Sequence, residues 1–342
     1  MFPDLRRLLT ILLWALLLWD IASAQERGRY AGARETVYPE WFKDSFLDLR
    51  EDITEAAENG RRVMIFFHQD GCPYCHLMVE RNLSQRTIQD VLRRQMDVIE
   101  LNIFGDREVT ALDGQSTTEK AFAAALGVQF TPTLLFFDEQ GEVVLRLNGY
   151  IPPQSFQLAL NYVTGHMESE LSYRRYLENN RPTAPQGELN PEDYHRPPPY
   201  NLAVRSGKPL AVFFEQVQCP DCDRLHHEVL VDSQIRELLG RYDVVQLDMW
   251  SNTPLITFAG EQSDARSLAR ELGVTFAPTF ILFDPQGREV LRSEAIFKQF
   301  HTASILDYVV SGAYLEQPNF QRYIAARAER LREQGQDVDI WK

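Results

Sequence analysis

Cysteine is scarce in this chain. Only four cysteines occur among 342 residues, and they fall in two Cys-x-x-Cys pairs, Cys72 with Cys75 and Cys219 with Cys222. A small secreted scaffold held by disulfides carries many cysteines, spread over its loops so that each bond closes a long ring. The sequence therefore excludes a disulfide-stapled scaffold and indicates that the two pairs serve chemistry.

Positively charged residues are also few relative to negatively charged ones. The chain has 35 Lys and Arg against 49 Asp and Glu, which gives a formal net charge of −14. Binding to nucleic acid depends on Lys and Arg that neutralise phosphates, and a surface of the opposite sign repels them. We therefore exclude nucleic acid as a partner.

Long apolar runs are missing beyond one near the start. That run, at 8–19, ends at Asp20, and it is shorter than the roughly 20 residues of a spanning helix. It follows two arginines and precedes Ala-Ser-Ala at 22–24, which is the order of a signal peptide with its cleavage site. A membrane anchor is the alternative. We expect a signal peptide at 1–24, export to the periplasm, and no stable membrane insertion after cleavage.

The sequence repeats itself at one long period. An apolar run at 63–67 leads into the first cysteine pair, and a similar run at 210–214 leads into the second. Further along, the pattern Leu-Gly-Val-x-Phe-x-Pro-Thr at 126–133 recurs at 272–279. Because the order and spacing of the motifs are both kept, the two halves are duplicates of one domain.

A segment dense in proline, asparagine and glycine separates the duplicates, and its proline run favours a stiff, extended linker. We expect a first domain at 36–178, a linker at 179–199 and a second domain at 200–335.

Each half predicts the same order of strands and helices. Strands that alternate with helices favour an α/β fold, here two domains that each have a central mixed sheet flanked by helices. The expected elements are helices at 77–94 and 225–239, strands at 98–103 and 244–249, helices at 118–126 and 264–272, and strands at 134–138, 143–147, 280–284 and 289–292.

Four segments stand outside the shared pattern. An amphipathic helix is expected at 44–59, before the first strand. The insertions at 105–117 and 251–263 are rich in polar turn residues and are interpreted as surface loops, with a role in substrate choice as the alternative. The stretch 320–332 predicts an amphipathic helix for core packing or a dimer contact.

The place of each cysteine pair, between a buried strand and a helix, has a chemical consequence. The first cysteine lies at the helix N-terminus, where unpaired backbone N–H groups favour an anion. A thiolate there attacks a substrate disulfide, and the second cysteine then resolves the mixed disulfide. We assign Cys72 and Cys219 as nucleophiles and Cys75 and Cys222 as resolving thiols, so that the redox disulfides are Cys72–Cys75 and Cys219–Cys222.

Zinc sites use the same Cys-x-x-Cys spacing, so a structural metal is the alternative. The two pairs lie far apart in the sequence, each embedded in its own domain, and no fifth cysteine is present. The neighbouring His76, His226 and His227 are interpreted as helix-surface residues. We expect neither a metal nor another cofactor.

A proline follows each pair well downstream, in Thr131-Pro132 and in Ala277-Pro278. The order of strand, Cys-Pro-x-Cys, helix, insertion and Thr-Pro-Thr before a strand resembles the thioredoxin superfamily, most closely the SoxW-type periplasmic thioredoxins linked to sulfur oxidation. The resemblance covers nearly all of the chain beyond the leader, twice. It implies cis bonds at Pro132 and Pro278, pairing of the Thr131 and Ala277 backbone with a bound peptide, and reduction by a membrane electron-transfer protein.

The chain departs from that family at the residue six positions before each first cysteine. Ordinary thioredoxins carry a buried Asp there, whereas this sequence has Phe66 and Phe213. His68 and Glu215, four positions before their cysteines, are interpreted as partly exposed strand-end residues, with proton acceptance as the alternative.

The interiors of the two motifs also differ, Pro-Tyr in the first and Pro-Asp in the second. An acid at Asp221 disfavours a thiolate beside it and raises the pKa of the Cys219 thiol. The reduced form then loses stability relative to the disulfide. The sequence therefore predicts a lower, more reducing potential for the second domain, which would pass electrons to the first.

These features favour a periplasmic thiol:disulfide oxidoreductase of the protein-disulfide reductase type, with protein thiols and disulfides as partners. A disulfide isomerase is one alternative, because two active sites in one chain fit that activity. A client-binding or chaperone module whose cysteine pairs are merely structural is the other.

Overall fold

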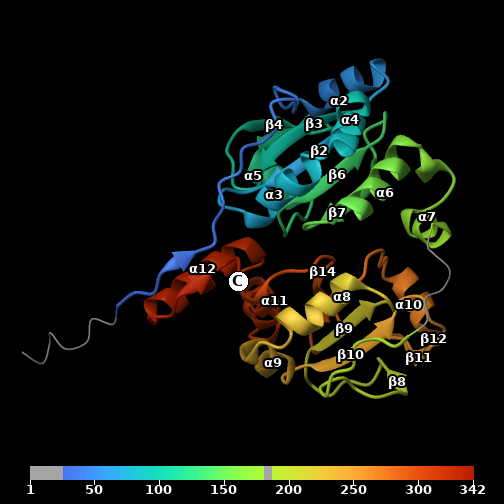
Figure 1. Cartoon of the computed structure of the whole chain (residues 1–342), viewed down its shortest axis with the longest axis vertical. Helices are drawn as coiled ribbons and strands as arrows, with labels where there is room; N and C mark the ends of the chain where they lie inside the picture. The colour runs from blue at the N-terminus through green and yellow to red at the C-terminus, as the bar shows by residue number, and fades with distance from the viewer. Residues whose placement is uncertain (1–25, 181–186) are drawn as a thin grey trace, which may run out of the picture.

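The computed structural model describes residues 26–180 and 187–342 (Figure 1). Two similar units follow one another along the chain, and we call them the first repeat (49–179) and the second repeat (200–333). The signal peptide expected at 1–24 lies outside the described residues. Within the two described ranges, no helix has both the length and the apolarity needed to cross a membrane.

A four-stranded mixed sheet forms the centre of the first repeat, in the order β3-β2-β6-β7. The central strand β2 runs parallel to β3 and antiparallel to β6, and β6 runs antiparallel to β7. All seven residues of β2 are buried, because helices cover both faces of the sheet and alternate residues enter the core on each face. The strands are β2 (Arg62–His68), β3 (Met96–Asn102), β6 (Thr133–Phe137) and β7 (Val143–Asn148).

The second repeat has the same sheet, in the order β10-β9-β13-β14 and with the same strand directions. Its strands are β9 (Leu210–Glu215), β10 (Asp243–Asp248), β13 (Thr279–Phe283) and β14 (Glu289–Ser293). The predicted fold class, two α/β units with mixed central sheets flanked by helices, is confirmed.

Helices cover both faces of each sheet. In the first repeat α2 (Leu49–Glu58) and α5 (Glu119–Ala125) pack on one face and α6 (Pro153–Thr164) packs on the other. In the second repeat α10 (Ala265–Glu271) and α11 (Gln299–Val310) take the places of α5 and α6.

The helix expected at 44–59 begins only at Leu49. The side chain of Asp48 accepts the backbone N–H groups of Arg50 and Glu51. A carboxylate in this position fixes a helix N-terminus, so the residues before it stay outside the helix.

The single helix predicted after each cysteine pair is wrong, because the chain forms two helices with a π-helical turn between them. In the second repeat Asp232 lies in extended backbone, and its side chain accepts the N–H groups of Gln234 and Ile235, which starts a new helix. The apolar spacing continues across this break, so the sequence pattern alone reads as one helix. The pieces are α3 (Pro73–Met78), the turn Val79–Leu83 and α4 (Arg86–Gln95) in the first repeat, and α8 (Pro220–Arg224), the turn Leu225–Val229 and α9 (Ser233–Leu239) in the second.

The two insertions are hairpins rather than structureless surface loops. The first holds β4 (Glu108–Thr110) against β5 (Ser116–Thr118), and the second holds β11 (Pro254–Ile256) against β12 (Gln262–Asp264). The second hairpin is extended by β8 (Tyr200–Asn201), which pairs in parallel with β11.

The described part of the predicted linker lies along the second repeat and is not a free spacer. Glu192 accepts a hydrogen bond from Arg236 Nη1 at 3.1 Å, and its other oxygen lies 3.0 Å from His226 Nδ1. These contacts hold the segment beside the helices that follow the second cysteine pair.

Equivalent residues of the two repeats meet in the seam between them. Asn148, at the end of β7, donates Nδ2 to Glu294, which follows β14 at the same place in the second repeat, at 2.6 Å. Next to this pair, a Cβ on Gly149 would come within 2.7 Å of the Cβ of Ala295, and Gly149 has a φ of 84°. Glycine is therefore required at this crossing, and a local twofold axis passes through it.

The helix that ends the first repeat packs on the second. Following the 3₁₀ turn Met167–Ser169, α7 (Tyr173–Asn179) places the ring of Tyr173 5.9 Å from that of Phe276. Arg174 donates to the carbonyl oxygens of Met249, at 2.9 Å, and Val274. Phe276 and Val274 lie directly before the second proline loop, and Met249 directly follows β10 (Asp243–Asp248).

The helix that ends the second repeat does the reverse. Following the 3₁₀ turn Ala313–Leu315, α12 (Phe320–Glu333) places Phe320 5.4 Å from the ring of Phe130. Gln321 Nε2 donates to the carbonyl oxygen of Gln129 at 2.9 Å. Of the two roles expected at 320–332, core packing is the one seen within this chain, because Phe320 belongs to an apolar core that spans both repeats.

The C-terminal segment continues past α12 toward the other end of the chain (Figure 1). Its last strand, β15 (Val338–Asp339), pairs in parallel with β1 (Tyr30–Ala31). The first and last segments of the described chain therefore lie together beside α12.

Candidate active site

The first cysteine pair lies where β2 leads into α3. Cys72 caps α3, and the backbone N–H of Cys75 donates to Cys72 Sγ at 3.0 Å. The two cysteines form a disulfide, and their exposed fractions are 2% and 0%. After reduction the same N–H is placed to stabilise a thiolate on Cys72.

The second pair repeats this geometry. Cys219 caps α8, accepts the N–H of Cys222 at 3.0 Å and forms a disulfide with it. Cys219 keeps 4% of its surface exposed and Cys222 keeps 1%. The cysteine with the greater exposure is again the one that caps the helix.

Both predicted proline loops lie beside their cysteines. The Thr131-Pro132 and Ala277-Pro278 peptide bonds are cis. In the first repeat Cys72 Sγ is 3.5 Å from the carbonyl oxygen of Thr131 and 3.3 Å from its Oγ1, and in the second repeat Cys219 Sγ is 3.7 Å from the carbonyl oxygen of Ala277. The structure thus brings the predicted cysteines and loop residues of each repeat together.

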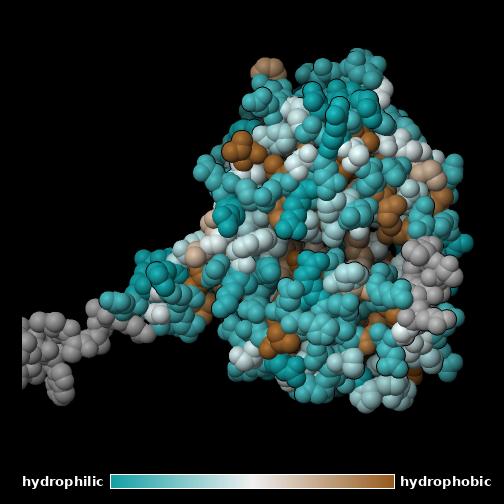
Figure 2. Space-filling model, viewed as in Figure 1, coloured by the Kyte–Doolittle hydropathy of each residue, from teal (hydrophilic) through white to brown (hydrophobic). Residues whose placement is uncertain are grey.

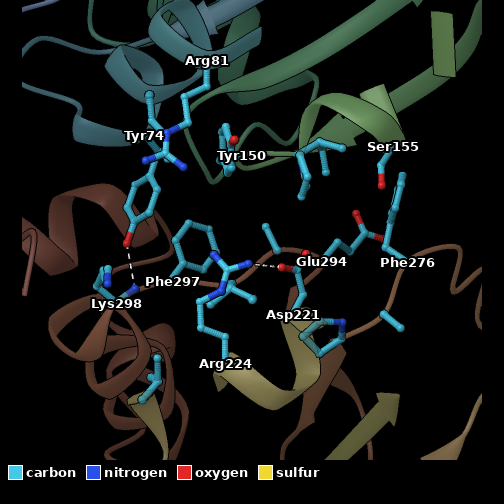
Figure 3. Close-up of a pocket in the computed structure, with 18 of the residues that line it drawn as sticks. Tyr74, Arg81, Tyr150, Ser155, Asp221, Arg224, Phe276, Glu294, Phe297 and Lys298 are labelled. Atoms are coloured by element: carbon cyan, nitrogen blue, oxygen red, sulfur yellow. Dashed lines mark hydrogen bonds and ion pairs between the residues drawn. The ribbon is translucent and has the colours of Figure 1, made fainter. Parts of the chain in front are cut away.

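The first motif is covered by the second repeat. The hydroxyl of Tyr74, the interior residue of the motif, accepts the backbone N–H of Lys298 at 2.8 Å (Figure 3). Its ring lies edge-on to Phe297, 5.1 Å away, and to Trp341, 5.3 Å away. Burial raises the pKa of Tyr74, and the weaker opposing effect of the Lys298 N–H does not offset it, so the phenol stays protonated.

A small cavity of about 230 Å³ remains beside Cys72. Its walls include Ile324 and Ala328 of α12 and Ile340 of the C-terminal segment. α12 and the C-terminal segment therefore cover the first site.

The second motif is more open. Pro220 is exposed and the side chain of Asp221 keeps 27% of its surface, whereas the corresponding Pro73 and Tyr74 are both buried. A cavity of about 470 Å³ lies in the seam beside this motif, and Pro278 lines it. Figure 3 shows Tyr74 and Asp221, the interior residues of the two motifs, facing this cavity from the two repeats.

The interpretation of His68, Glu215 and His226 as exposed or partly exposed residues is wrong. Their exposed fractions are 7%, 0% and 1%. His226 Nε2 lies 2.8 Å from Glu215 Oε1, and His68 Nε2 lies 2.5 Å from Glu100 Oε2. Each strand that leads into a cysteine pair thus ends on a buried residue that is hydrogen-bonded to a second side chain, which satisfies the polar groups that burial removes from water.

A signal for one of these pairs was present in the sequence. His226 follows Cys222 by four positions, and residues with that spacing share one face of a helix. A histidine on the face of a buried cysteine is also buried and needs a partner, and Glu215, at the end of the preceding strand, is the partner.

The charges around the second motif shift two pKa values. Burial alone would lower the pKa of His226, but Glu215 and Glu192 outweigh it and raise that pKa above its ordinary value. Burial also raises the pKa of Asp221, against a smaller lowering by Arg224. A protonated His226 donates to both carboxylates and so holds them in place below the resolving cysteine's helix.

Within the described residues, no group of three or more His, Cys, Asp or Glu side chains is placed to hold a metal ion.

A family model described as a thioredoxin-like domain matches residues 49–164 and again residues 200–309. No curated protein matches the chain.

Solved structures similar to parts of the chain include a thioredoxin-fold protein from Helicobacter pylori, at 19% identity over 35% of this chain and 84% of that one, with a TM-score of 0.31. A thioredoxin from Thermus thermophilus matches at 26% identity over 40% and 87%, with a TM-score of 0.26. The C-terminal domain of Neisseria meningitidis DsbD in its reduced form matches at 16% identity over 34% and 93%, with a TM-score of 0.26.

Proposed function

Because the chain belongs to the thioredoxin-like domain family, with one copy in each half, we propose that it is a thiol:disulfide oxidoreductase that reduces or exchanges disulfides of exported proteins. The observation that carries this proposal is the pairing, in both repeats, of a helix-capping cysteine with a proline loop less than 4 Å from its sulfur.

The electron balance follows from the geometry. A reduced Cys219 attacks one sulfur of a substrate disulfide, that bond breaks, and the leaving sulfur departs as a thiolate. Cys222 then attacks Cys219, releases the second substrate sulfur and leaves the Cys219–Cys222 disulfide. The substrate gains two electrons, which a dithiol donor must return to the protein before the next cycle. Cys72 and Cys75 perform the same steps in the first repeat.

An insulin-reduction assay tests the proposal. We expect Cys72→Ser and Cys219→Ser each to lower the activity with dithiothreitol as the reductant, and the double variant to lose it. Activity that survives the double change would leave only the client-binding or chaperone function.

Three further parts of the proposal concern the location of the protein, its domain boundaries and its electron donor. We propose that residues 1–24 direct export to the periplasm, that 36–178 and 200–335 are domains joined by a linker at 179–199, and that the donor is a membrane electron-transfer protein, as the SoxW-type resemblance implies. Sequencing the N-terminus of the exported protein tests the first point, with Gln25 expected as the first residue.

Disulfide isomerisation is the second candidate function, and the seam favours it. Tyr74 and Asp221, from the two motifs, line one cavity, so a substrate held there contacts both sites. Recovery of activity from scrambled ribonuclease tests this function, and both single cysteine variants should slow it.

A further inference from the structure

The cavity in the seam has the size of a small-molecule site and not of a protein-docking face. Its volume is about 470 Å³, within the roughly 300–1,000 Å³ of ligand pockets. Both repeats line it, and the space-filling view shows apolar side chains recessed between them (Figure 2). A ligand of a few residues fits this volume, whereas a folded protein does not.

The usual way for a peptide to bind, as a strand added beside the proline loop, meets an obstacle in both repeats. In the first, Gln321 of α12 donates a hydrogen bond to the carbonyl oxygen of Gln129, and Thr131 is buried. In the second, Arg174 of α7 occupies the carbonyl oxygen of Val274. A long added strand therefore has to displace α12 from the first repeat or α7 from the second.

The cavity reaches the proline loop beside the second cysteine pair. Ala277 and Pro278 line it, and the carbonyl oxygen of Ala277 lies 3.7 Å from Cys219 Sγ. A disulfide placed against this loop is next to the attacking sulfur.

The charges in the cavity point to the chemistry of its ligand. Asp221 pairs with Arg224, Lys298 lies 3.9 Å from Glu228, and Glu294 lies 3.8 Å from Arg292. Arg81 also lines the cavity (Figure 3), and in 26–180 and 187–342 it has no ion-pair partner. A guanidinium binds a carboxylate through two parallel hydrogen bonds, and the ring of Tyr74 nearby offers apolar contact.

We propose that this cavity binds a short peptide disulfide that carries a carboxylate, and that Cys219 reduces it. The proposal rests on the proposed function, because it names the substrate class of the second site. Attack by Cys219 breaks the peptide disulfide, and Cys222 releases the second half as a thiol. The peptide gains two electrons, and the site is left as its own disulfide until a dithiol reduces it.

Two variants and two matched controls test the proposal in the full-length chain carrying Cys72→Ser and Cys75→Ser. Arg81→Glu reverses the free charge, and its control is Arg93→Glu on exposed surface of α4. Ser155→Trp fills the cavity from α6, and its control is Gln154→Trp, which is exposed on the same helix.

The pre-reduced protein, freed of dithiothreitol, is mixed with glutathione disulfide or with cystamine, which has no carboxylate. The reaction is quenched with acid, and the loss of the protein's own thiols at Cys219 and Cys222 is measured by alkylation and mass spectrometry. We expect Arg81→Glu to slow the reaction with glutathione disulfide about tenfold, because one charge-assisted contact is lost. The rate of the reaction with cystamine should stay within about twofold of the parent rate. Ser155→Trp should slow both, and both controls should match the parent. An Arg81→Glu protein equal to Arg93→Glu toward glutathione disulfide overturns the proposal.

An insulin arm identifies the source of the peptide. Slowing of insulin reduction by Ser155→Trp supports a chain segment of a protein as the ligand, and unchanged insulin reduction supports a free peptide disulfide. Both results keep the cavity as the site.

Binding of S-methylglutathione, which has no disulfide, separates this proposal from the proposed function. We expect the oxidised protein to bind it, and Arg81→Glu and Ser155→Trp to weaken that binding about tenfold. Binding without any disulfide reduction would refute the oxidoreductase function alone. Reduction without binding would refute the cavity as its site.

Discussion

At the scale of single residues, the two sites differ in what surrounds their sulfurs. The first motif places a protonated phenol, Tyr74, against the second repeat, whereas the second places a half-buried carboxyl, Asp221, at a cavity. Beneath the second motif, Glu215 has no exposed surface and holds His226. A buried carboxylate next to a histidine stabilises the charged imidazole, so this pair links the stability of the second repeat to pH.

The first prediction concerns Glu215→Gln. The raised pKa of His226 contributes stability that is present below the ordinary pKa of about 6.5 and is lost as pH rises through the higher folded pKa. Removing the charge of Glu215 should cost about 3 kcal/mol at low pH and flatten this dependence. Urea unfolding between pH 5.5 and 8.5 measures both effects. Glu237→Gln, at an exposed position of the same repeat, is the control, and an unchanged slope in Glu215→Gln would contradict the assignment.

At the scale of elements, the sequence predicted what local chemistry decides. The strands around each motif, the helices at 118–126 and 264–272 and the position of the proline loops agree with β2, β6, α5 and their counterparts to within a few residues. The π-helical turns were not predictable from periodicity, because Leu225 and Val229 keep the apolar spacing while the backbone changes its hydrogen bonds.

The sequence also did not predict that the last helix of each repeat packs on the other repeat. The match between Tyr173 and Phe320 in the two halves shows duplication, but sequence spacing carries no information about which repeat an amphipathic helix covers. The length of α12 and the apolar face it presents to Phe130 become meaningful only when both repeats are placed.

The second prediction concerns this packing of the last helices. Phe320 is 1% exposed and packs on Phe130, so Phe320→Ala should cost about 3–5 kcal/mol and loosen α12 over the first site. Reduction of Cys72–Cys75 by dithiothreitol should then be faster. Mass spectrometry of alkylated cysteines after an acid quench measures each pair separately. Tyr173→Ala is the matched variant and should act on Cys219–Cys222 instead. Rates at both pairs that match those of the unaltered protein, in both variants, would show that the helices do not control access.

At the scale of the whole molecule, the two repeats form one body because a single apolar core crosses the seam. The repeats come close together at Gly149 and Ala295, since a Cβ on Gly149 has no room and its φ of 84° disfavours a side chain.

The third prediction separates these two causes. Gly149→Ala should destabilise the protein by more than Gly260→Ala, because Gly260 has the same φ of 84° but nothing within 4 Å of an added Cβ. The φ strain alone costs about 1 kcal/mol, and the contact with Ala295 adds to it. Urea unfolding of both variants measures the loss in the free energy of unfolding. Equal losses would mean that the seam accommodates the added methyl group without further cost.

The direction of electron flow between the repeats depends on the same whole-molecule arrangement. Asp221 disfavours the Cys219 thiolate and so favours the disulfide, whereas Tyr74, held protonated by burial, puts no charge beside Cys72. The second site should therefore have the lower potential and pass electrons to the first. Asp221→Asn should raise the potential of the second pair by roughly 30 mV, the equivalent of about 1.4 kcal/mol. Glutathione titration of the full chain with Cys72→Ser and Cys75→Ser measures it, and Asp223→Asn, on exposed surface beside the motif, is the control. If the two variants, Asp221→Asn and Asp223→Asn, have the same potential at Cys219–Cys222, the charge of Asp221 does not set the direction of electron flow.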